Sequence, residues 1–91
     1  MNNQTKNKVS KLSERCGSIV DLIEELKEEI EHIKDSMQER YDNMTERIQE
    51  GDKGDELQSE IDKFESIISA LEQAGEEAMT AKDDLNEISE N

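Results

Sequence analysis

The fold is decided by residues 19–37, which read IVDLIEELKEEIEHIKDSM. Apolar residues recur in this stretch at alternating intervals of four and three, and they are Ile19, Ile23, Leu26, Ile30, Ile33 and Met37. This spacing puts the apolar side chains on one stripe of an α-helix, which packs against another helix. Most residues between them are acidic, so we expect the rest of the helix surface to face water.

The same spacing extends toward the N-terminus as far as Val9, with Cys16 on the stripe. Gly17 costs ~1 kcal/mol in a helix interior, and Ser18 with Asp21 could cap a helix that restarts there. The stripe stays in phase across the glycine. We therefore favour one continuous helix over a break.

After Met37 the phase of the stripe changes, and the next apolar residues are Tyr41, Met44 and Ile48. One explanation is a four-residue stutter in a helix that covers about residues 9–49. The other is that the helix ends near residues 42–43 and Thr45 begins a separate turn, because asparagine is a fair helix terminator.

Gly51 and Gly54 predict a turn at residues 51–54, since glycine readily adopts a positive φ. Asp55 can cap a second helix over about residues 55–88, with Gln58 as its capping-box partner. The apolar residues of this helix also recur at helical spacing, and its predicted packing residues are Leu57, Ile61, Phe64, Ile68, Leu71 and Leu85.

Together these elements predict an all-α fold, an antiparallel two-helix hairpin of the coiled-coil type. Residues 1–8 are expected to be a flexible, polar and basic tail, and residues 9–91 a single helical-hairpin domain. The apolar stripes are wider than a two-helix contact needs. We therefore expect a homodimer that forms a four-helix bundle, with a marginal monomeric hairpin as the alternative.

The charge of the chain limits its partners. The 91 residues carry a formal net charge of −14 and are 31% hydrophobic. Residues 1–17 contain four basic residues and one acid, a net charge of +3, which leaves −17 on residues 18–91. Such a surface repels nucleic acid and anionic membranes and attracts basic protein surfaces. We expect no direct nucleic-acid binding and no membrane insertion.

The chain is expected to reside in the cytoplasm. Its single cysteine excludes an internal disulfide and is typical of a reducing compartment. The segment 1–10 has no apolar core of a secretory signal. The longest apolar run is two residues, far too short to span a membrane.

No group of residues indicates catalysis, a metal or a cofactor. His32 is the only histidine and is expected to be a solvated surface residue. Cys16 is expected to be a small buried apolar residue rather than a reactive thiol. The acidic segment 52–56 lacks the ligand spacing of a calcium loop. We therefore expect a protein that is not an enzyme.

The carboxylates themselves are the remaining candidates for function. Like charges three or four residues apart lower helix stability by a few tenths of a kcal/mol each, so their abundance needs a reason. Either they serve solubility, or they bind a basic partner. The candidate partner-binding residues are Glu24, Glu25, Glu28, Glu29, Glu31, Asp35, Glu65, Glu72, Glu76, Glu77, Asp83 and Asp84.

The segment Tyr41-Asp42-Asn43-Met44, with Gln49 and Gly54-Asp55-Glu56 after it, resembles a class of short acidic helical proteins encoded by phages and other mobile elements. The resemblance covers about residues 20–88. Members often have proline near the position of Thr45. The resemblance implies a phage or mobile-element origin, in which small acidic proteins often inhibit host defence or nucleic-acid enzymes.

Two functional hypotheses follow. The first is an acidic inhibitor that mimics DNA and occupies a basic, nucleic-acid-binding surface of a host protein, with carboxylates in place of phosphates. The second is a structural or adaptor coiled coil, or an assembly chaperone component, that docks a partner helix on the small residues of the segment 74–81. In the second case, Ala78→Leu would abolish partner binding without a change in charge.

Overall fold

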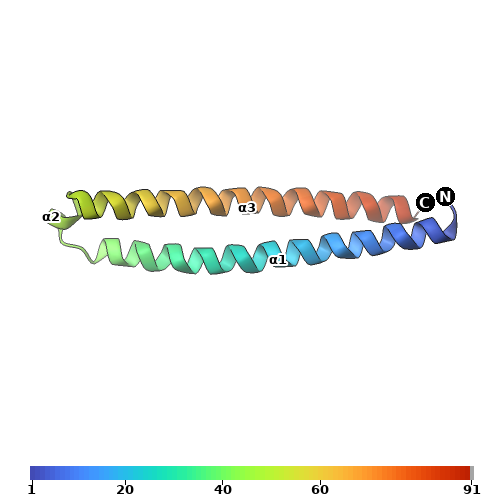
Figure 1. Cartoon of the computed structure of the whole chain (residues 1–91), viewed down its shortest axis with the longest axis horizontal. Coiled ribbons are helices and arrows are strands. Elements are labelled where there is room, and N and C mark those ends of the chain that lie inside the picture. Colours follow the sequence, from blue (N-terminus) through green and yellow to red (C-terminus); the bar gives the residue numbers. More distant parts are fainter. Residues whose placement is uncertain (91) are drawn as a thin grey trace. The chain divides into compact units, whose positions relative to one another are not determined.

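The computed structural model describes residues 1–90, and these residues form three α-helices and no strand. Helix α1 spans Asn3–Asp42, α2 spans Glu46–Gln49 and α3 spans Asp52–Glu90 (Figure 1). The predicted all-α class is confirmed for this part of the chain.

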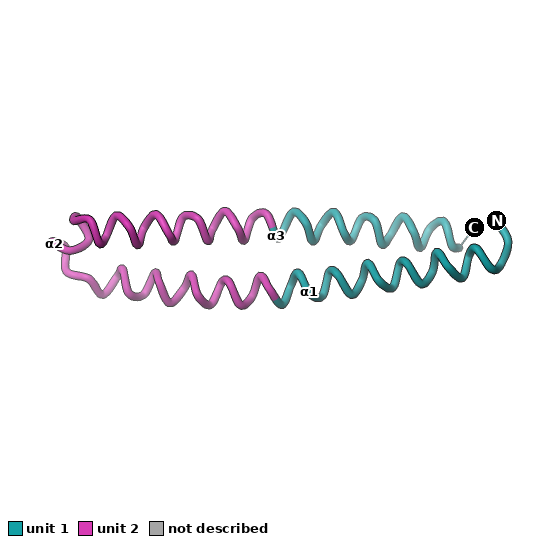
Figure 2. Tube along the Cα trace, viewed as in Figure 1, with its two compact units in different colours: residues 1–25, 71–91 teal, residues 26–70 magenta. Residues whose placement is uncertain are grey.

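The chain divides into two compact units (Figure 2). Unit 1 consists of Met1–Glu25 and Leu71–Asn91, and unit 2 of Leu26–Ala70. Each unit contains one segment of α1 and one segment of α3. The two units are described separately below.

Unit 2 is a helical hairpin. The end of α1 and the start of α3 lie side by side and run in opposite directions, with α2 in the connection (Figure 1). Leu57, Ile61 and Ile68 of α3 are buried in this unit, and Ile61 is only 1% exposed. Burial of such side chains is the main source of stability in a two-helix unit, because each contributes about 1.5–3 kcal/mol.

The connection in unit 2 corrects the prediction of one helix over residues 9–49, because α1 ends at Asp42. Thr45 adopts an extended conformation as the N-cap of α2, and its Oγ1 accepts a hydrogen bond from the backbone N–H of Ile48 at 3.4 Å. Gln49 Nε2 donates to the carbonyl of Tyr41 at 2.7 Å, which satisfies one of the last carbonyls of α1. The alternative of a helix end near residues 42–43 is therefore the better description.

Helix α3 begins at Asp52, so the predicted turn at residues 51–54 and the predicted helix start at Asp55 are both displaced. The Asp55 N–H donates to the carbonyl of Gly51 at 3.0 Å, which places Asp55 inside the first turn rather than at its cap. Asp52 and Asp55 favour this helix start because carboxylates stabilise the positive end of the helix dipole.

Gly54 is required for close packing and not for an unusual φ. Among residues 1–90 no glycine has a positive φ. A Cβ built on Gly54 would lie only 2.1 Å from the carbonyl oxygen of Gln49 and 2.6 Å from its Cα. The backbone of the connection therefore contacts α3 at a place where only glycine fits.

Unit 1 contains a second antiparallel helix pair, in which the buried centre is polar. Ser13 is 2% exposed, and its hydroxyl donates to Asn86 Oδ1 at 2.6 Å. It also lies 3.2 Å from the carbonyl oxygen of Lys82. A Cβ built on Gly75 would lie 3.6 Å from Ile23 Cγ2. The residue numbers on α3 fall as those on α1 rise, so the two segments run in opposite directions.

The start of α1 differs from the prediction of a flexible tail over residues 1–8. Helix α1 begins at Asn3, and Asn2 Oδ1 accepts a hydrogen bond from the Thr5 N–H at 2.8 Å. The Asn2 carbonyl also accepts the Lys6 N–H at 3.0 Å. Asparagine is among the best N-caps, which explains a helix start before the first apolar residue.

The predicted continuity of α1 through Gly17 agrees with the structure. Ser18 does not cap a new helix, and its hydroxyl instead donates to the Glu14 carbonyl at 3.4 Å.

Gly17→Ala is expected to raise the free energy of unfolding by about 1 kcal/mol, because alanine is the better helix former. A Cβ at this position would lie 3.5 Å from Lys82 Cε, which is ordinary van der Waals contact. Urea denaturation followed by far-ultraviolet circular dichroism measures the change. A loss of stability would show that the contact with Lys82 cannot accommodate the methyl group.

The packing positions of α1 are also displaced from the predicted stripe. Ile23, Ile30 and Met37 are half-buried as expected, but Ile19, Leu26 and Ile33 are 50%, 46% and 50% exposed. Val20, Lys27 and Lys34, each one residue later, are less exposed. Lysine stems can cover apolar surface while their ammonium groups reach water, which allows lysines to hold packing positions. On α3 the predicted residues Leu57, Ile61, Phe64, Ile68, Leu71 and Leu85 are all buried or half-buried.

Candidate interaction surfaces

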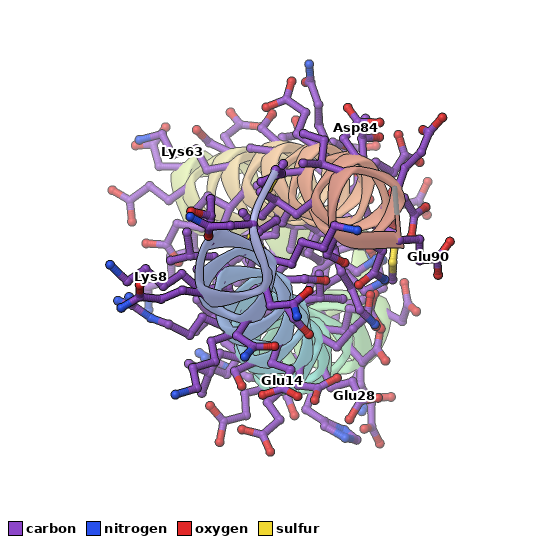
Figure 3. All side chains as sticks on the ribbon, turned by 90° about the vertical axis from the view of Figure 1, so that its right-hand side faces the viewer. Lys8, Glu14, Glu28, Lys63, Asp84 and Glu90 are labelled. Atoms are coloured by element: carbon purple, nitrogen blue, oxygen red, sulfur yellow. The ribbon has the colours of Figure 1, made fainter. Side chains whose placement is uncertain are left out.

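The candidate acidic residues lie on the outer surfaces of the helices. Glu31 is half-buried, and the other eleven are exposed, namely Glu24, Glu25, Glu28, Glu29, Asp35, Glu65, Glu72, Glu76, Glu77, Asp83 and Asp84. Figure 3 shows that side chains project outward all around the ribbons, with Glu28 as an example from unit 2 and Asp84 as an example from unit 1. These carboxylates lie on the continuous helices α1 and α3, so the directions of their side chains follow the regular period of an α-helix.

The other candidates for chemistry lie apart from one another. His32 is exposed, and Cys16 is half-buried on α1. The acidic segment 52–56 is helical. No group of three or more histidine, cysteine or acidic residues within residues 1–90 is placed to hold a metal ion. No helix in this part of the chain is long and apolar enough to cross a membrane.

Each long helix carries a second, exposed apolar stripe with a period of seven residues. On α1 this exposed stripe consists of Leu12, Ile19, Leu26 and Ile33, all between 44% and 50% exposed. On α3 its exposed members are Ile67, Ala81 and Ile88, and the intervening position of this period, Ala74, is half-buried. The stripe on α1, part of which is predicted to pack within the hairpin, is instead exposed to water.

In unit 2 the two exposed stripes line one groove. This open groove of about 480 Å³ is lined by Ile33 and Met37 of α1 and by Phe64 and Ile67 of α3. Glu60 and Lys63 complete its lining. Exposed Ile33 is followed in the sequence by half-buried Lys34. Exposed Ile67 is likewise followed by buried Ile68.

The same offset occurs in unit 1. Leu12 precedes Ser13, which contacts α3, and Ala81 precedes Lys82, whose side chain lies beside Gly17 of α1. One residue corresponds to a rotation of about 100° around an α-helix. The two segments are antiparallel. A rotation of the same sense around each helix, starting from the contact between them, therefore leads to the same side of the helix pair. This side is called the apolar face of unit 1, and its members are Leu12, Ile19, Ala81 and Ile88.

Charged residues of unit 1 point in different directions from the helix pair. In Figure 3, Lys8 and Asp84 point toward the left and the top, whereas Glu14 and Glu90 point toward the bottom and the right. The opposite side of the unit carries a shallow pocket lined by residues that include Glu14, Asp21 and Met79. The charged residues next to the apolar face therefore differ from those on the opposite side of unit 1.

The small residues of segment 74–81 are not a free docking surface. Ala74, Gly75 and Ala78 are half-buried, and Gly75 lies next to Ile23 of α1. Only Ala81 in this set is exposed. Small side chains here allow α1 and α3 to approach each other within unit 1, so Ala78→Leu would disturb the hairpin itself.

Comparison with protein-family models, with curated proteins and with solved structures finds no match to this chain.

Proposed function

We propose that this chain is a non-enzymatic protein-binding module, which uses its exposed carboxylates to occupy a basic, nucleic-acid-binding surface of a host protein. Occupation of that surface excludes the nucleic acid and inhibits the partner. The observation that carries the proposal is the exposure of eleven acidic side chains along two long helices.

The physical support is electrostatic. A net charge of −14 attracts a basic surface and speeds association. Carboxylates on a helix are held at regular intervals, so a basic groove can pair with several of them at once. The resemblance of residues 41–56 to acidic proteins of phages and mobile elements further supports the inhibitory form of the proposal. We place its action in the cytoplasm, where its single cysteine stays reduced.

A second candidate is an adaptor or structural coiled coil. The exposed apolar stripes favour it, because half-exposed Ile19, Leu26 and Ile33 could pack against a partner helix. The same stripes support the proposal that two copies of the chain associate into a four-helix bundle, since each helix of such a bundle contacts two neighbours. In both cases the carboxylates would remain on the outside.

Salt dependence distinguishes the two candidates. After affinity capture from the source cells and identification by mass spectrometry, the partner is purified and its dissociation constant is measured at increasing NaCl concentration. Binding through carboxylates is expected to weaken at least about tenfold between roughly 50 and 200 mM salt. Contact through the apolar stripes would leave the affinity nearly unchanged, which would contradict the electrostatic proposal.

A charge-neutral variant provides the control. Glu76→Gln, Glu77→Gln, Asp83→Asn and Asp84→Asn together remove four exposed charges from α3 and keep the size of each side chain. This variant should bind more weakly at low salt and should show a shallower salt dependence. An unchanged affinity at all salt concentrations would exclude this part of α3 from the binding surface.

A further inference from the structure

We infer that the apolar face of unit 1 is the surface on which a second copy of this chain docks, in an arrangement that sets Arg15 of each copy against Asp84 of the other. This inference rests on the self-association proposed above and names the surface and the orientation that it would use.

The apolar side chains of this face expose a large part of their surface, although the buried centre of unit 1 is polar. Leu12, Ile19 and Ile88 are 44%, 50% and 44% exposed, although Ser13 is the only residue of this unit that is buried within the described residues. Leu22 lies beside Ile19 on the same helix and is 63% exposed. Contact with water at these side chains is unfavourable, and a second apolar face removes it.

The two edges of the face carry opposite charges. On α1, Lys8 lies four residues before Leu12 and Arg15 three residues after it, so both border the exposed stripe. On α3, Asp84 lies three residues after Ala81, and Glu77 lies four residues before it. All four charged residues are exposed. The face therefore has a basic edge on α1 and an acidic edge on α3.

Opposite edges make the face self-complementary. When a second copy is placed on it with a two-fold axis parallel to the helices of the unit, α1 of each copy lies against α3 of the other. Each basic edge then meets an acidic edge. Within one copy Ser13 is level with Asn86, and Gly17 is level with Lys82. Arg15 is therefore level with Asp84, whereas Glu77 is level with Leu22 and meets no basic residue. The two-fold axis brings Arg15 of one copy to Asp84 of the other.

Sedimentation equilibrium of the full chain and of charge-swapped variants tests this arrangement. Arg15→Asp alone and Asp84→Arg alone should each raise the dimer dissociation constant at least about tenfold, because each places like charges opposite each other. The double variant Arg15→Asp/Asp84→Arg should restore the dissociation constant to near that of the original chain.

A matched double variant supplies the control. Arg15→Asp/Asp83→Arg has the same net charge as the restored variant, but Asp83 is rotated by about 100° from Asp84 around α3. It should stay as weak as Arg15→Asp. Circular dichroism shows whether every variant keeps its helix content, and only variants that keep it are compared.

Three results would overturn the inference. A chain that is monomeric up to millimolar concentration has no such dimer, and the proposed self-association fails with it. A dimer that is unaffected by either single swap uses another face. Restoration by Asp83→Arg as well as by Asp84→Arg would show an effect of net charge alone. Binding of a basic partner is measured separately by its salt dependence, so its failure can be distinguished from each of these outcomes.

Discussion

Ile61→Ala is expected to lower the free energy of unfolding by about 2–5 kcal/mol, the usual range for an isoleucine removed from a core. Ile61 is 1% exposed, and it shares the interior of unit 2 with only two other buried apolar residues, Leu57 and Ile68. Small domains have total stabilities near the low end of about 5–15 kcal/mol. The variant should therefore be largely unfolded at a temperature at which the original chain is folded.

Ile67→Ala is the matched control for this substitution. The same atoms are removed from the same helix, but Ile67 is 43% exposed and lies on the exposed stripe. In the monomeric chain its cost should be below about 1 kcal/mol, because less apolar surface is involved and no closed cavity is formed. Urea denaturation of both variants measures the difference. Equal losses would show that Ile67 is as well packed as Ile61, for example by a second copy in solution.

Gly54→Ala is expected to destabilise the chain by about 1–3 kcal/mol or more, which is the typical cost of overpacking. The new Cβ would lie 2.1 Å from the Gln49 carbonyl oxygen and 2.5 Å from its carbonyl carbon, and neither backbone atom can rotate away as a side chain could. The connection between α2 and α3 must move to accommodate it. Gln49 would then lose its hydrogen bond to the Tyr41 carbonyl.

The control is Gly75→Ala on the same helix. There the added Cβ would lie 3.6 Å from Ile23 Cγ2, an ordinary contact, so the gain in helix propensity should dominate and stability should rise by about 1 kcal/mol. Opposite signs for the same substitution in α3 would identify close packing at Gly54 as the cause. A stabilising Gly54→Ala would mean that the connection does not approach α3 as closely as described.

The helices could be predicted from the sequence because apolar spacing and the absence of proline both favour them. The packing positions of α3 were also predictable, since residues such as Leu57, Ile61 and Ile68 are unambiguously apolar. Those of α1 were harder to predict. Its apolar residues cover a broad stripe, and Lys27 and Lys34 look like surface residues in the sequence although they are half-buried.

Local details of the helix ends depend on single hydrogen bonds that the spacing of apolar residues does not reveal. Asn2 extends α1 toward the N-terminus, and Thr45 caps α2. The role of Gly54 depends on its distance from Gln49, which no sequence pattern encodes. The exposed acidic residues could be predicted because charged side chains almost always remain in water.

Competition with duplex DNA shows whether the carboxylates of this chain replace phosphates on a basic surface. The captured partner is saturated with a labelled duplex, and the chain is added while the anisotropy of the label is followed. If the chain occupies the nucleic-acid-binding surface, we expect complete release of the duplex and an apparent dissociation constant of the duplex that rises linearly with the concentration of free chain. A ternary complex, in which partner, duplex and chain are bound together and the anisotropy does not fall, would contradict it.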